Sequence, residues 1–217
     1  MKKFLKIVGI LAGLGVLAVI VMVALLPWMD RWGATDSEVT AAYSGDELVR
    51  SPRIIYTRAI SINAAPEEIY PWIVQLGALK GGMYSYEWFE TNILRCELIN
   101  ADRIHEEWQD LKVGDKVKMC PEDNWGPPAY EVAIMEPDHV VVLGHKRSSP
   151  VDQENGTWSD VWQFVLVPQD DGTTHLILRS RDVKEGLIWD LFRPGEFIMV
   201  RGMLLGIKER AEGTAGR

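Results

Sequence analysis

The longest apolar run of the chain extends from Ile7 to Leu26, twenty residues without a charged or strongly polar side chain. It is preceded by Lys2, Lys3 and Lys6. As a helix this run is roughly 30 Å long, the thickness of the hydrocarbon core of a bilayer. A cleaved signal peptide is the alternative, but its apolar region is usually about 7–15 residues long and ends in a small-x-small site. That site is missing here, so we expect residues 1–27 to form an uncleaved transmembrane signal anchor, with residues 7–26 in the membrane.

The charges on either side of this run predict its orientation. Lysines lie before it, whereas the flank after it carries acids, beginning with Asp30. Since basic residues stay on the cytoplasmic side, we expect a single-pass membrane protein with a cytoplasmic N-terminus and an extracytoplasmic domain. Trp28 and Trp32 either lie at the level of the lipid headgroups or pack on the domain. An oxidising compartment permits a disulfide between Cys96 and Cys120, but two buried thiols fit the sequence equally well.

Beyond the apolar run, the pattern changes to short alternating segments. Residues 28–53 are polar and rich in turn formers, which indicates a connecting segment that wraps the domain. In residues 54–62 every second residue from Ile54 to Ile62 is apolar except one, which predicts a strand. Further strands are predicted at residues 116–119, 130–135, 139–143, 158–167 and 173–181. Short strands joined by tight turns predict an antiparallel sheet.

Three segments have helical spacing instead. The first begins at Pro66, carries an apolar stripe that includes Trp72, and is expected to bend at Pro71 and stop at Gly77. A second is expected to begin at Ser85, with an apolar face made of Tyr86, Phe89 and Ile93.

The third helical segment closes the chain. Apolar residues recur at helical spacing from Phe197 to Ala211, which predicts a long amphipathic helix. Gly202 and Gly206 would allow this helix to approach the sheet closely, at a cost of about 1 kcal/mol each in helix propensity.

Composition and charge narrow the class of protein. The 217 residues are 47% apolar and 25% charged, as expected for a globular domain with a real core. After residue 27 the chain carries 20 bases against 31 acids. So acidic a domain has no basic surface for phosphate backbones, and nucleic-acid binding is excluded as a main function.

Motifs for cofactors are missing from the sequence. The four histidines have no metal-ligand spacing, and neither H-E-x-x-H nor Cys-x-x-Cys occurs, so no metal is expected. There is no G-x-S-x-G, no G-x-G-x-x-G and no Walker lysine loop. We therefore expect no nucleotide cofactor and no serine-hydrolase chemistry of that class.

Several short sequence motifs, taken together in their order along the chain, resemble those of a known superfamily. They are Trp32–Thr35, Gly45–Leu48, Pro66–Gly77, Gly82–Trp88, Asn100–Ile104, Glu107–Gln109, Val113–Asp115 and Pro194–Arg210. With them the chain resembles the START-like helix-grip superfamily (SRPBCC, polyketide cyclase/dehydrase-like), and within it a membrane-anchored bacterial branch. The resemblance implies an α+β helix-grip domain over residues 54–212, in which a curved antiparallel sheet surrounds the long C-terminal helix. It also implies a cavity between sheet and helix for an apolar small molecule.

Large aromatic side chains are the candidates for lining such a cavity, although core packing accounts for any one of them equally simply. The candidate ligand-binding residues are Trp72, Tyr84, Tyr86, Trp88, Trp162, Phe164 and Phe197, together with Arg179. Arg179 either points inward as a polar group or lies on the solvent face or the rim of the sheet. Catalytic candidates are weaker. Asp102 and His105 form a polar pair suited to proton transfer, with Tyr84 as a third candidate, but such a stretch also serves simply to hold a loop.

Three functions follow from these expectations. The leading hypothesis is a membrane-tethered binding domain for a hydrophobic small molecule or lipid. The second is an acid–base enzyme, cyclase-like or hydratase-like, that acts on an apolar substrate. The third is a non-catalytic structural or interaction protein whose filled core supports an acidic surface.

Overall fold

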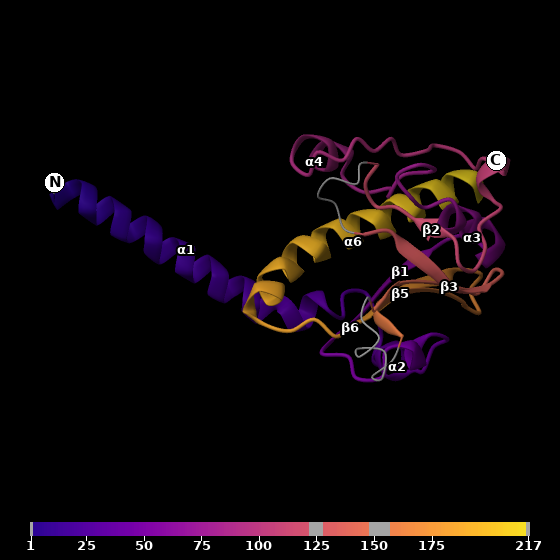
Figure 1. The fold of residues 1–217 in the computed structure, drawn as a ribbon, viewed down its shortest axis with the longest axis horizontal. Helices are drawn as coiled ribbons and strands as arrows, with labels where there is room; N and C mark the ends of the chain where they lie inside the picture. Colours follow the sequence, from indigo (N-terminus) through magenta and orange to yellow (C-terminus); the bar gives the residue numbers. More distant parts are fainter. Residues whose placement is uncertain (1, 122–127, 148–156, 216–217) are drawn as a thin grey trace.

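A computed structural model describes residues 2–121, 128–147 and 157–215 of the chain. Its centre is a curved six-stranded sheet in the order β1-β6-β5-β4-β3-β2, in which all neighbours are antiparallel (Figure 1). The strands are β1 (Ile54–Ile62), β2 (Lys116–Val117), β3 (Tyr130–Glu136), β4 (Val140–Lys146), β5 (Trp158–Pro168) and β6 (Thr174–Asp182). All six predicted strands are confirmed, and β1 has the predicted bounds.

The two faces of the sheet follow from the alternation within its strands. On β5, Trp162, Phe164 and Leu166 point into the main core, which also holds the C-terminal helix. Val161 and Val165 point to the opposite face and form a second core. Both faces are therefore covered, and most residues of β5 and β6 are buried whichever way they point.

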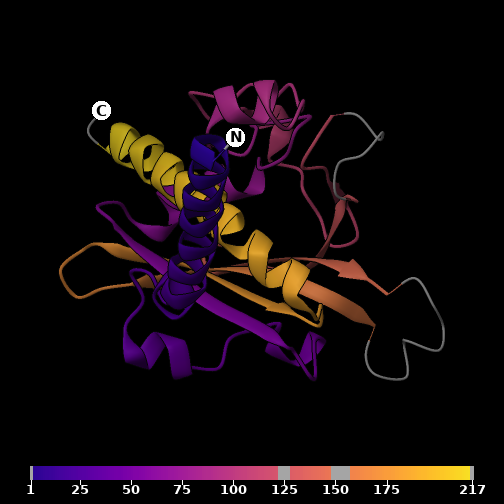
Figure 2. The same ribbon diagram turned by 90° about the vertical axis from the view of Figure 1, so that its left-hand side faces the viewer.

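The main core is closed by α6 (Leu187–Ala215), which crosses one face of the sheet (Figure 2). The α+β class, with a curved antiparallel sheet and a long C-terminal helix, is thus confirmed. The helix begins at Leu187, ten residues before the predicted apolar periodicity, which starts at Phe197. In its first two turns Leu187, Ile188 and Phe192 are exposed, so the apolar stripe that predicts the rest of the helix does not extend into this part.

The opposite face of the sheet is covered by the segment that joins α1 to β1. This segment contains α2 (Asp36–Thr40) and η1 (Asp46–Leu48). Val49 is buried in the second core, with Tyr43 and Leu48 packed against it. Residues 34–49 therefore form an outer layer that the sheet needs in order to bury its second apolar face.

The remaining helices are short. They are α3 (Pro66–Val74), α4 (Glu87–Asn92) and η2 (Glu106–Trp108). The predicted start of α3 at Pro66 is confirmed, and the Glu68 carboxylate accepts a hydrogen bond from the backbone N–H of Ala65 at 2.9 Å. The helix ends at Val74, three residues before Gly77, whose φ of +131° makes the following turn.

The glycines of α6 make a close approach, but not to the sheet. A Cβ on Gly206 would lie 2.0 Å from the backbone oxygen of Tyr84, and one on Gly202 would lie 2.7 Å from the ring of Tyr86. The expectation of close contact with the sheet is therefore wrong. Large side chains separate α6 from the sheet. On the side of α6 that faces away from the sheet, residues 84–86 lie directly against Gly202 and Gly206.

Replacing Gly206 by Ala is expected to destabilise the protein by about 2 kcal/mol, because the new methyl group meets a backbone oxygen that cannot rotate away. Gly195→Ala on the same helix is the matched control, since a Cβ there has no neighbour within 4 Å. It is expected to stabilise the protein by about 0.5–1 kcal/mol. Denaturant unfolding of the two full-length variants checks this, and effects of equal sign would contradict the close approach.

The first helix, α1 (Lys2–Met29), extends away from the domain (Figure 1). Its last turns contact α6, where the rings of Trp28 and Trp32 pack edge-on against Phe197 at centroid distances of 5.5 and 6.1 Å. Arg193 of α6 forms an ion pair with Asp30 at the same junction. Among the described residues, no helix has the combination of length and mean hydropathy needed to cross a membrane.

Candidate functional site

A cavity of about 180 Å³ lies between α6, β5 and the chain on either side of α4. Its lining consists of Met83, Ser85, Glu90, Leu94, Cys96, Leu98, Met119, Trp162, Met199, Val200 and Met203. Most of these side chains are buried, and Ser85, Leu94, Met119 and Met199 are half-buried. The space between sheet and helix is thus not filled by tryptophans, and a small apolar volume remains.

Sulfur and aromatic groups dominate this lining. Four of the eight methionines of the chain contribute to it. Methionine is flexible and polarizable, so it adapts to ligands of different shapes. Trp162 supplies the large ring, and its position is fixed by Tyr130 and Phe164 at centroid distances of 5.2 and 6.5 Å.

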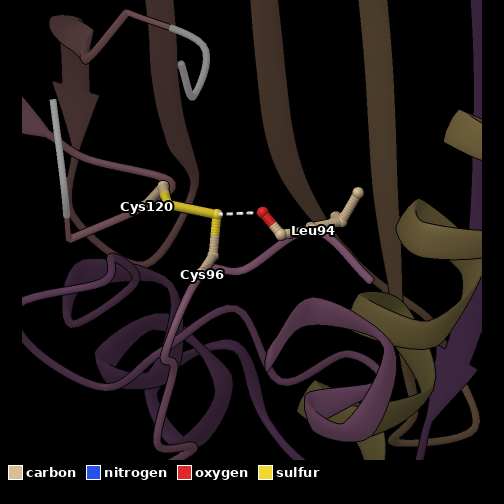
Figure 3. The surroundings of a disulfide bond; sticks show 3 residues. All are labelled: Leu94, Cys96 and Cys120. Carbon is tan, nitrogen blue, oxygen red and sulfur yellow. Dashed lines mark hydrogen bonds between the residues drawn. A yellow bond between two sulfur atoms is a disulfide. The ribbon is translucent and has the colours of Figure 1, made fainter. Parts of the chain in front are cut away.

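A disulfide between Cys96 and Cys120 forms part of the cavity wall (Figure 3). The two Cα atoms lie 5.1 Å apart, so of the two alternatives left open by the sequence, the disulfide is the one present. It ties the segment after α4 to the segment after β2. The carbonyl oxygen of Leu94, another lining residue, lies 3.7 Å from the Cys96 sulfur.

Among the lining residues that the structure describes, Glu90 is the only charged one. Its side chain is only 2% exposed, and its Oε2 has no hydrogen-bond partner among the described residues. Burial raises the pKa of Glu90 to about 7, and the nearby negative charge of Glu87 acts in the same direction. The backbone carbonyl of Glu90 accepts a hydrogen bond from the N–H of Cys96 at 2.9 Å, so helix and disulfide hold each other in place.

The orientation of α4 is opposite to the prediction. Tyr86, Phe89 and Ile93, the expected apolar face, are 42%, 37% and 53% exposed, whereas Glu90 is turned inward. The helix also begins at Glu87, without a capping bond from Ser85. Six residues make fewer than two turns, so the disulfide and the preceding loop decide which side faces the core.

Of the predicted ligand-binding residues, Trp162 lines the cavity. Trp72 and Phe164 are fully buried in the core, where Trp72 packs edge-on against Tyr84 at 5.8 Å. Phe197 packs on the end of α1 rather than in the cavity lining. Tyr86 and Trp88 are exposed, Trp88 by 69%. Sequence reasoning missed Glu90 and the methionines, because neither an acid in a short helix nor scattered methionines form a pattern.

Arg179 lies on the other face of the sheet from the cavity. Its guanidinium donates to the carbonyl oxygens of Glu38, Val39 and Ala41, to an Asp46 carboxylate oxygen and to the Thr57 hydroxyl, at 2.7–3.1 Å. Arg179 therefore holds the outer layer on the sheet and does not line the cavity.

The catalytic candidates lie outside the cavity lining, around Gln75. This buried side chain donates to the Tyr84 hydroxyl at 2.9 Å and accepts from the backbone N–H of His105 at 3.1 Å. Burial raises the pKa of Tyr84 above its usual range. The His105 ring lies 3.1 Å from a Glu107 carboxylate oxygen, and His105 shares a surface depression with Asp102. The described residues contain no group of three His, Cys, Asp or Glu side chains arranged to hold a metal ion.

Comparisons with known proteins give distant structural similarities. Neither a protein-family model nor a curated protein matches the chain. The structure is similar to the Aha1 dimer from Colwellia psychrerythraea, with 16% identity, 73% of this chain and 96% of that chain covered, and a TM-score of 0.43. A protein from Arthrobacter aurescens gives 13% identity, coverages of 81% and 92%, and a TM-score of 0.45. The KanY protein gives 12% identity, coverages of 75% and 99%, and a TM-score of 0.44. Since one fold hosts many unrelated functions, function has to come from the site itself.

Proposed function

We propose that the protein binds a small hydrophobic molecule in the cavity between α6 and β5. The observation that carries this proposal is a largely apolar cavity between α6 and the sheet that is partly open to solvent. Of the eleven lining residues that the structure describes, ten are uncharged. Empty apolar space is costly because the atoms around it lose dispersion contacts, and an apolar guest restores those contacts.

The volume favours a small guest over a whole lipid. An apolar cavity of about 150 Å³ accommodates benzene, whereas typical ligand pockets have about 300–1,000 Å³. At about 180 Å³ the cavity suits a single ring or a short alkyl chain. A larger molecule would have to leave part of its body outside, beside the half-buried residues Leu94 and Met199.

We further propose that α1 tethers this domain to a membrane, as in the membrane-anchored branch that the sequence resembles. Leu14, Leu17 and Ile20 on α1 are each more than half exposed, a surface that lipid would cover favourably. A disulfide in the domain fits an oxidising compartment outside the cytoplasm. External protease on sealed cells is expected to remove a C-terminal tag. A tag that stays fully protected contradicts this orientation.

The bound molecule is expected to be found by native mass spectrometry and by solvent extraction of the full-length chain purified in lipid nanodiscs. Leu94→Trp should block the cavity at its half-buried side and abolish the bound molecule. Val113→Trp is the matched control, because Val113 is 62% exposed and does not line the cavity. A molecule retained equally by both variants, or none in the unmodified chain, counts against the cavity as a binding site.

An acid–base enzyme is the second candidate, and Glu90 is the observation that favours it. A buried carboxyl with a pKa near 7 in an apolar site is suited to proton transfer at neutral pH. An enzyme should convert the bound molecule into a product, and Glu90→Gln should lose this conversion. A simple binding protein should release the molecule unchanged.

A further inference from the structure

The Glu90 carboxyl group is an unusual occupant of an apolar cavity. An unpartnered buried polar group costs about 1–3 kcal/mol, and more when it is charged. Glu90 is 2% exposed, and its Oε2 has no hydrogen-bond partner among the described residues. Since Glu90 lines the cavity, a ligand bound there can supply the partner that Oε2 lacks among the described residues.

The charges around Glu90 indicate which partner suits it. No lysine, arginine or histidine is among the cavity-lining residues that the structure describes. The charged group acting on Glu90 is Glu87, another acid. The ionised carboxylate thus has no counter-charge from the described lining, and the local potential is negative. A cationic ligand is favoured here and an anionic one is repelled.

The rest of the lining also suits a cation with an apolar body. The face of a tryptophan ring attracts ammonium groups by about 0.5–2 kcal/mol, more when the cation is desolvated. Trp162 shares the cavity with Glu90, together with the polarizable sulfurs of Met83, Met119, Met199 and Met203. A carboxylate, an aromatic ring and soft sulfur atoms around one small space form a site for a protonated amine.

Resting on the proposed binding function, we propose that the cavity selects a small apolar amine whose ammonium group pairs with the Glu90 carboxylate while its hydrocarbon part packs against Trp162 and the methionines. The ligand is an aryl or alkyl ammonium ion with a hydrocarbon body about the size of one ring. Neutral molecules and anions of the same shape bind with lower affinity.

Three probes of one shape and different charge test this: benzylamine, benzyl alcohol and benzoate, at pH 8. The full-length chain in nanodiscs carries carbon-13 in its methionine methyl groups, so the four cavity methionines report binding and the other four act as internal references. Free probe concentrations are corrected by titrating empty nanodiscs. We expect benzylamine to bind at least tenfold more tightly than benzyl alcohol, and benzoate to leave the cavity signals unchanged.

Two variants link this preference to Glu90. Glu90→Gln keeps the size of the side chain and is expected to bring the ratio between amine and alcohol close to one. Glu87→Gln removes an acid of the same helix that does not line the cavity, and is expected to keep the preference. Equal binding of amine and alcohol by the unmodified chain, or a preference that survives Glu90→Gln, overturns the amine site but leaves the apolar cavity function standing. If no probe shifts the cavity methionines, the proposed function fails as well.

Discussion

Arg179→Met is expected to lower the free energy of unfolding by about 3–5 kcal/mol, the usual loss when one partner of a buried ionic network is removed. Arg179 is 3% exposed, and all five of its N–H groups have acceptors. Three of these acceptors are backbone carbonyls at the C-terminal end of α2, which have no partner within that short helix. Methionine fills a similar volume but leaves the three carbonyls without the donors that Arg179 supplies. It also removes one ionic partner of the Asp46 carboxylate, which keeps its bonds to the Tyr43 N–H and to Gln163 and its ion pair with Arg181.

The loss is expected to be concentrated in the outer layer. Without the Arg179 bonds, residues 36–48 should detach from the sheet more readily, so hydrogen exchange of their amides should accelerate more than that of α6. Arg53→Met is the matched control, since Arg53 pairs with Glu185 at 3.4 Å and both side chains are 63% exposed. Exposed pairs contribute about 0–1 kcal/mol. If denaturant unfolding gives the two variants equal stability losses, Arg179 does not hold the layer in place.

Arg179 also shows why the sequence predicted the strand but not the side of the sheet. Ile177 and Arg179 share one face of β6, and Leu176 and Leu178 share the other. One face of the sheet is covered by residues 34–49 and the other by α6, so both faces carry apolar residues. The alternation therefore does not identify the face that meets the helix. The order and bounds of the strands were predictable because turn residues separate them, whereas the facing of a strand depends on the layer that covers it.

The cavity was harder to predict from the sequence than the strands were. Its aromatic member, Trp162, was among the predicted residues because large aromatic side chains suit an apolar cavity wall and the superfamily resemblance implies a cavity beside the strands. Glu90 was not, because α4 is too short for its periodicity to fix an orientation, and the disulfide that holds it joins residues 24 apart. A cavity is the volume that side chains leave unfilled, and no single residue type specifies it.

Between about pH 4.5 and pH 7 the stability of the protein is expected to fall as pH rises, and Glu90 is expected to cause about 3 kcal/mol of the fall. The sign follows from proton binding. In the unfolded chain Glu90 titrates near 4.5, whereas in the folded protein burial raises its pKa to about 7. Within this window the folded state holds a proton that the unfolded state has lost, so raising the pH favours unfolding. Above pH 7 both states are ionised, and the full penalty of the buried charge remains.

Glu90→Gln isolates this contribution, because the amide stays neutral at every pH while the other titrating groups are unchanged. At pH 5 the variant and the unmodified chain should be equally stable within about 1 kcal/mol, since both carry a neutral side chain. At pH 8 the variant should be the more stable by about 3 kcal/mol. Glu97→Gln, an exposed acid seven residues further along, should show no such pH-dependent gain. Denaturant unfolding of the full-length chains at the two pH values decides the point. A Glu90→Gln variant that is destabilised at pH 8 would show that the carboxylate already has a partner inside the protein, and the reason for seeking one in a ligand would disappear.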